Sequence, residues 1–344
     1  MKKSLLALAT LTAFAGAASA QSSVTLFGVV DVGVAYTAGA GTNKTLMTTD
    51  GNASSRLGFR GVEDLGGGLR AGFWLEGALS ADDGSAAYQG YRRRSTLSLL
   101  GNWGEVRLGR DYTPTFWNWT VFDPFGTNGV GAATNLGLEV STFNGGSYGT
   151  LVRADNSVGY HLPSMGGLYG QIMVAAGEGV ENSGGLANKN YSGRLGWSSG
   201  PFNIAASYGL TEASASIDFT NWNVAGSFNA GFGTFSAFYS QLEADQNRFD
   251  QTNWYLGYQM PLGAFTLKAT YGSVERDAGP NTGDATQIAV GATYDLSKRT
   301  ALYGTYSQIE NDGTAFRVFG GTNALPSTRG VDSKGLQVGV RHSF

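Results

Sequence analysis

The feature that most constrains this chain is the regular alternation in its last segment, from Gly335 to Phe344. Its apolar side chains stand at every second position, at Leu336, Val338 and Val340, with polar or small residues between them. A two-residue period gives a β-strand with one apolar and one polar face. The same pattern recurs along most of the chain, so the fold must offer an apolar environment on one side of its strands and a polar one on the other.

The N-terminus has the organisation of a secretory signal. Lys2 and Lys3 form a charged region, an apolar stretch follows, and the small residues Ala18 and Ala20 flank a cleavage site. The apolar stretch of about 14 residues is too short for a membrane helix, which needs roughly 20. We therefore expect residues 1–20 to be removed and residues 21–344 to be exported as one domain.

Sixteen segments alternate in this manner, and the connections between them are short and long by turns. Seven short connections are rich in turn residues, as at Leu65–Gly68 and Gly101–Gly104. An even number of strands places both termini on one side and lets the last strand pair with the first, which leaves no open edge in lipid. We predict an all-β protein, a transmembrane 16-stranded antiparallel β-barrel in a bacterial outer membrane, with both termini periplasmic. A large soluble β-sandwich would not explain the alternation of short and long connections.

The third long connection, at about residues 111–150, is the longest. Loops of more than ~15 residues are usually functional. In a barrel wide enough to hold water, this loop can fold inward, and we predict that it does. Its aromatic residues Trp117, Trp119 and Phe122 either pack the loop against the wall or line a track for a solute.

The apolar neighbours of each arginine indicate which face of the strand it occupies. Leu57 and Phe59 point toward lipid, so the residues that alternate with them point into the lumen. A charge facing lipid costs about 2–4 kcal/mol at mid-depth, which favours a charged, water-filled lumen. The same argument applied to the next strands gives a basic wall made of Arg56, Arg60, Arg92, Arg94 and Arg153.

Aromatic residues on the apolar face are unevenly distributed. Strands 8 to 15 carry many of them, among them Trp197, Tyr239 and Trp254, as expected for the aromatic girdles at a lipid interface. Strand 16 and strands 1 to 5 carry mainly Val and Leu. We therefore predict that strands 16 and 1–5 meet other subunits.

The composition excludes several classes of function. The chain has no cysteine and two histidines, and its net charge is −3. A metal site or cofactor is not expected, nor is binding to nucleic acid. An outer-membrane barrel enzyme, such as a lipase or protease, would need a histidine within reach of a nucleophile. His161 and Ser157 lie about 13 Å apart along one strand, so no enzymatic activity is expected.

At several points the sequence resembles the general porins of Gram-negative bacteria, especially the betaproteobacterial and neisserial branch. The matching stretches are residues 23–33, 55–69, 104–110, 156–160, 294–300 and 338–344. The resemblance implies a homotrimer of sixteen-stranded barrels in which the third loop constricts each lumen. It also implies a basic wall facing acidic groups of that loop.

Particular residues can be assigned roles through this resemblance. The wall arginines of the family correspond best to Arg56, Arg94 and Arg153. Candidates for the acidic groups of the constriction loop are Asp123, Asp111 and Glu139. The C-terminal Phe344 matches the aromatic residue that the outer-membrane assembly machinery reads.

The expected function is passive diffusion of small hydrophilic solutes and ions, with a mild anion preference because inward bases outnumber inward acids. Lipid and lipopolysaccharide of the outer membrane are the expected surroundings. The alternative is a substrate-specific outer-membrane channel, in which the loop aromatics would bind one class of solute.

Overall fold

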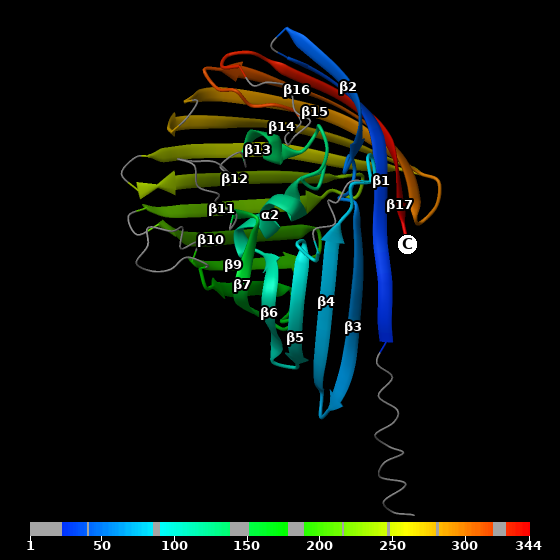
Figure 1. Cartoon of the computed structure of the whole chain (residues 1–344), viewed down its shortest axis with the longest axis vertical. Coiled ribbons are helices and arrows are strands. Elements are labelled where there is room, and N and C mark those ends of the chain that lie inside the picture. Colours follow the sequence, from blue (N-terminus) through cyan, green and yellow to red (C-terminus); the bar gives the residue numbers. More distant parts are fainter. Residues whose placement is uncertain are drawn as a thin grey trace, which may run out of the picture.

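The computed structural model describes residues 23–39, 41–84, 90–137, 151–177, 189–214, 217–245, 248–279, 282–318 and 328–344. They form one antiparallel sheet that closes on itself, because the first strand pairs with the last as well as with its sequence neighbours. Among the described residues no helix has the length and hydropathy needed to cross a bilayer. Figure 1 shows the curved wall with a short helix, α2, inside it.

The strands follow one another around the wall in chain order, and each short connection predicted from the sequence joins two of them. Their bounds are β1 Ser23–Gly39, β2 Thr42–Thr49, β3 Arg56–Gly66, β4 Leu69–Ala78, β5 Arg94–Gly101, β6 Gly104–Tyr112, β7 Arg153–His161, β8 Leu168–Ala175, β9 Lys189–Ser199, β10 Phe202–Ser214, β11 Ile217–Asn229, β12 Thr234–Ala244, β13 Phe249–Leu262, β14 Phe265–Ala278, β15 Gly283–Asp295, β16 Thr300–Asp312 and β17 Ser333–Ser343. Two helical segments complete the order, α2 Pro114–Phe122 and the 3₁₀ turn η1 Ala133–Leu136.

The seventeen strand segments make sixteen wall strands, because β2 and β3 both pair with the same side of β1. They are two parts of the second wall strand, interrupted between Asp50 and Ser55. The prediction of a 16-stranded barrel is thus confirmed. The composition of residues 37–53 predicts a long connection between strands, and this prediction is wrong, since Thr42–Thr49 continues the sheet and Thr42 pairs with Gly39 of β1.

Side chains that alternate between apolar and polar along the sequence lie alternately on the outer and inner faces of the barrel wall. In β17, Leu336, Val338 and Val340 are exposed on the outer face, whereas Ser333 and Gln337 are buried on the inner face. Apolar groups are therefore exposed where a membrane surrounds the wall, and polar groups are buried inside. This inversion of the usual soluble pattern is what a barrel in lipid requires.

The third loop folds inward, as predicted, and begins as a helix. Thr113 caps α2 by accepting the backbone N–H of Phe116 at 3.3 Å, and Pro114 occupies the first turn. The helix lies against β8–β12. Trp119 is 1% exposed and packs on the ring of Phe238, with 4.2 Å between ring centroids.

The turn after α2 is organised by Asp123, which is 5% exposed. Its carboxylate accepts backbone N–H groups from Phe125 at 2.9 Å and from Thr127 and Ala133 at 3.0 Å. Burial raises the pKa of Asp123, and these backbone donors together with the charge of Lys268 act in the opposite direction. Both oxygens of this carboxylate therefore bind backbone N–H groups of the loop itself.

We predict that Asp123→Asn loosens the third loop. The amide keeps one acceptor oxygen and turns a donor toward a backbone N–H, which costs about 1–3 kcal/mol. The thermal unfolding midpoint of the refolded protein in detergent should fall, and the single-channel conductance should become noisier. Asp312→Asn, at the exposed end of β16, is the control and should change neither. An Asp123→Asn protein with the parental midpoint and noise would contradict this role.

Candidate functional site: the basic wall of the lumen

Strands β3 to β7 carry a row of arginines on the inner face of the barrel. The predicted residues Arg56, Arg60, Arg94 and Arg153 are all part of it, and Arg93 and Arg107 extend it. The opposite part of the wall, from β8 onward, is covered by the third loop. The loop therefore restricts the lumen from one side, and the arginines face the space that is left.

Three acidic residues pair with part of this row. Glu76 on β4 contacts Arg93 at 2.7 Å and Arg56 at 3.9 Å. Asp111 lies 3.8 Å from Arg94 and also pairs with Arg107. These pairs tie neighbouring strands together on the lumen side and fix the direction of the guanidinium groups.

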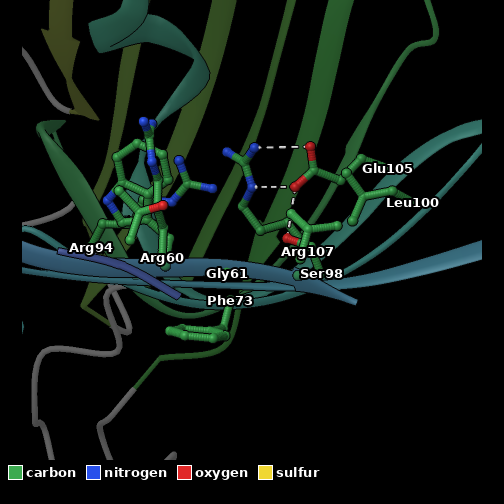
Figure 2. A pocket seen from close by; sticks show the side chains of 12 residues that line it. Arg60, Gly61, Phe73, Arg94, Ser98, Leu100, Glu105 and Arg107 are labelled. Carbon is green, nitrogen blue, oxygen red and sulfur yellow. Dashed lines mark hydrogen bonds and ion pairs between the residues drawn. The ribbon is translucent and has the colours of Figure 1, made fainter. Parts of the chain in front are cut away.

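Arg107 is held by a second acid as well. Glu105, two residues earlier on β6, accepts from its Nε at 2.9 Å and from an Nη at 3.1 Å. Figure 2 shows this pair beside Ser98, which donates to the same carboxylate at 2.7 Å. Arg60, Arg94 and Arg107 line one recess of the lumen surface.

Aromatic rings order the remaining guanidinium groups. Trp74 has Arg60 at 5.0 Å and Arg94 at 4.6 Å from its ring centroid, and the ring of Phe27 lies 5.3 Å from Arg60. Such contacts are favourable for a cation over an aromatic face. Within the described part of the chain Arg60 forms no ion pair, so its charge is directed at the lumen without an acidic partner.

Arg153 is arranged in a similar way. Its guanidinium lies 4.3 Å from the ring centroid of Tyr112 and donates to the Tyr112 hydroxyl at 2.8 Å and to the carbonyl oxygen of Arg93 at 2.9 Å. Tyr112 in turn packs on Phe116 of α2. Arg153 thus lies where the basic wall meets the start of the third loop.

Alternation along the sequence did not identify Arg93. The two-residue period predicts that the run from Arg92 to Arg94 belongs to a strand, with Arg92 and Arg94 inward. In the structure β5 begins only at Arg94, and Arg92 precedes it with an exposed side chain. Before the strand begins, the two-residue period does not apply, which is why Arg93 could contact Glu76. Glu76 is a useful signal in the sequence, because it alternates with Leu75 and is therefore an inward acid that needs a basic partner.

The three acidic candidates of the constriction loop are in different places. Asp111 belongs to β6 rather than to the loop and is buried between arginines of the wall. Asp123 lies in the loop, but its carboxylate binds the loop's own backbone. Glu139 is outside the described residues. The loop therefore starts after Tyr112, and among the described residues the acidic groups paired with the arginines come from the wall.

The loop aromatics have a packing role. Trp119 and Phe122 are buried against the wall, and Trp117 contacts the ring of Tyr112. Trp119 and Phe122 thus offer no surface for a sugar or aromatic solute. On the described wall of β3–β7, the arginines that face the lumen outnumber the acids Glu76, Glu105 and Asp111, so this geometry attracts anions rather than building a nucleophile.

Comparison with known proteins agrees with this geometry. A family model described as Gram-negative porin matches residues 7–314. Outer membrane porin protein 32 of Delftia acidovorans is 39% identical, with all of both chains covered. Major outer membrane protein P.IB of Neisseria meningitidis is 27% identical, again over the full length of both.

A solved structure described as an anion-selective porin from Comamonas acidovorans superimposes with a TM-score of 0.85. It is 33% identical, and the match covers 94% of this chain and 100% of that one. The family model spans most of the chain, and a relative of 39% identity aligns from end to end. The chain therefore belongs to the family of Gram-negative porins.

Proposed function

We propose that this porin forms a water-filled outer-membrane channel for passive diffusion of small hydrophilic solutes and ions, with a mild preference for anions. The observation that carries the preference is the surplus of arginine on the inner face of β3–β7. Charge on a narrow, low-dielectric wall acts on passing ions more strongly than the same charge in bulk water. The name of the Comamonas structure, an anion-selective porin, is consistent with this.

Arg56, Arg94 and Arg153 are the proposed residues of the constriction, with Arg60 on the same wall and Arg92 at its entrance. Arg94 and Arg56 lie near acids, whereas Arg60 and Arg153 have no ion pair within the described residues. Arg94 and Arg56, together with the acids near them, set the local direction of the electric field in the lumen. The others supply the net positive charge that raises the local concentration of anions.

A homotrimer is proposed for the assembled state. The outer faces of β17 and β1–β6 are exposed and mainly aliphatic, as at Leu97 and Val338. Exposed Trp and Tyr occur instead on β9–β16, for example at Trp197 and Tyr271. Aromatic girdles belong at a lipid interface, so the aliphatic sector fits contact with other subunits, and the aromatic sector fits lipid and lipopolysaccharide.

Phe344 is proposed as the residue read by the assembly machinery, with both termini in the periplasm. Its backbone N–H donates to the carbonyl of Gly28 at 3.1 Å, and its carbonyl accepts from the N–H of Gly28 at 3.1 Å. The side chain is exposed. A recognition element at the outer rim of the last strand is thus available before and after closure.

The preference for anions is tested by Arg56→Gln, Arg94→Gln and Arg153→Gln in one protein. We expect the chloride-to-potassium permeability ratio, taken from reversal potentials in a planar bilayer under a salt gradient, to fall by roughly a factor of two or more. Lys298→Gln with Arg299→Gln, both exposed in the turn before β16, removes charge away from the basic wall and should leave the ratio nearly unchanged. An unaltered ratio in the triple variant would remove these three residues from the proposal.

The subunit interface is tested with single cysteines, since the chain has none. Leu97→Cys on β5 and Leu256→Cys on β13 start from equally exposed side chains, at 58% and 56%. A short bismaleimide should link subunits through position 97 and not through position 256 in native outer membranes, as read by denaturing electrophoresis. Linkage confined to position 256 would place the interface on the other side of the barrel.

A further inference from the structure

The segment that interrupts the second wall strand turns into the barrel. Between β2 and β3, residues 50–55 leave the sheet, and Asp50 has a left-handed backbone with φ of 66°. A non-glycine residue in this conformation is held there by its surroundings. Here the side chain of Asp50 accepts the backbone N–H of Ser55, so the segment is closed at its base.

One buried carboxylate holds the segment in place. Asp31, in the middle of β1, is 0% exposed. Its two oxygens accept the backbone N–H groups of Gly51 at 3.3 Å, Asn52 at 2.8 Å and Ala53 at 2.7 Å. The hydroxyl of Tyr303, on β16, donates to the same carboxylate at 2.7 Å. Three successive backbone amides on one carboxylate fix the path of this segment far more tightly than an external loop would need.

The segment touches both sides of the site described above. The carbonyl oxygen of Ser54 accepts from an Nη of Arg56, in the basic wall, at 3.2 Å. The hydroxyl of Ser54 donates to the side-chain oxygen of Asn128, in the third loop, at 2.8 Å. Ser54 thus connects the arginine wall directly to the tip of the loop.

The backbones also meet closely at this point. Gly129 has φ of 67°, and a Cβ added to it would lie 2.3 Å from the carbonyl oxygen of Gly51. The next residue, Val130, donates its backbone N–H to the side chain of Gln337 at 3.2 Å, and Gln337 donates to Thr48 at 2.9 Å. The loop tip is therefore seated between residues 50–55 and β17.

We propose that residues 50–55 are a second constriction element of the channel and that Asp31 is its positioning residue. This rests on the proposed channel function and extends it. The third loop and residues 50–55 then both narrow the lumen, and residues 50–55 determine where the third-loop tip stops relative to the basic wall. Asp31 acts through residues 50–55 and touches no solute.

The test uses Asp31→Asn, which leaves the side-chain volume nearly unchanged but replaces one acceptor oxygen by a donor. Residues 50–55 should then lose backbone hydrogen bonds to position 31 and move away from the third-loop tip. We expect single-channel conductance to rise by roughly 1.5-fold, because flux follows the open area at the narrowest point, and we expect more open-channel noise. Asp312→Asn is the control and should keep the parental values. Reversal potentials on the same membranes report whether the anion preference persists.

A disulfide separates positioning from general damage to the fold. Ser54→Cys and Asn128→Cys introduce the only two thiols in the chain, at two side chains joined by a hydrogen bond. Added to Asp31→Asn, the pair should return conductance and noise to parental values after oxidation and lose this rescue after reduction. A merely destabilised barrel would not respond in this manner.

The outcomes are distinct. Failure of the two cysteines to link, or an Asp31→Asn channel with parental conductance and noise, would overturn the inference while leaving the diffusion channel and its ion preference in place. A parent protein without conductance would instead overturn the proposed function itself. If Asp31→Asn does not fold, Ser54→Ala with Asn128→Ala removes the hydrogen bond between residues 50–55 and the third loop instead. Unchanged open-channel noise in that variant would also overturn the inference.

Discussion

The rest of the structure depends on one constraint, that no backbone donor or acceptor can be left without a partner in hydrocarbon. The chain meets it by pairing β17 with β1 over residues 29–39 and 333–343. Closure by strands then requires every wall residue to face either lipid or the lumen. At the depth of the hydrocarbon, arginine and glutamate can be placed on these strands only on the inner face, so there the barrel wall itself separates apolar from charged side chains.

A lumen formed in this way would be wide and uniform if nothing entered it. Two elements do. The third loop is fixed through buried aromatic contacts such as Trp119 with Phe238 and through the backbone hydrogen bonds of Asp123. Residues 50–55 are fixed by Asp31. In both cases a single buried carboxylate replaces the sheet hydrogen bonds that the segment gives up, which is how irregular backbone can persist inside a membrane protein.

The sequence was sufficient for what depends on local periodicity. Strand existence, the short turns and the inward direction of Arg56, Arg60 and Arg94 all follow from alternation with apolar neighbours. It was insufficient where a contact between residues far apart in the sequence determines the path of the backbone. Residues 50–55 have the Asp, Gly, Asn and Ser composition of an external loop, and contacts with residues distant in the sequence, above all Asp31, hold them inside the barrel. The inward direction of Arg93 was not predicted for a related reason, since β5, which would set that direction, begins one residue later at Arg94.

The reciprocal hydrogen bonds between Gly28 and Phe344 bear on how the protein is made. Residues near the two ends of the chain are partners, so one side of the first strand lacks its neighbour until the last strand has been delivered, although β2 and β3 already pair with its other side. Contacts this distant in sequence form slowly. Until then the barrel is an open sheet with exposed edges and apolar faces, so the chain must be kept from aggregating during transit, and insertion can be completed only after export of the entire polypeptide.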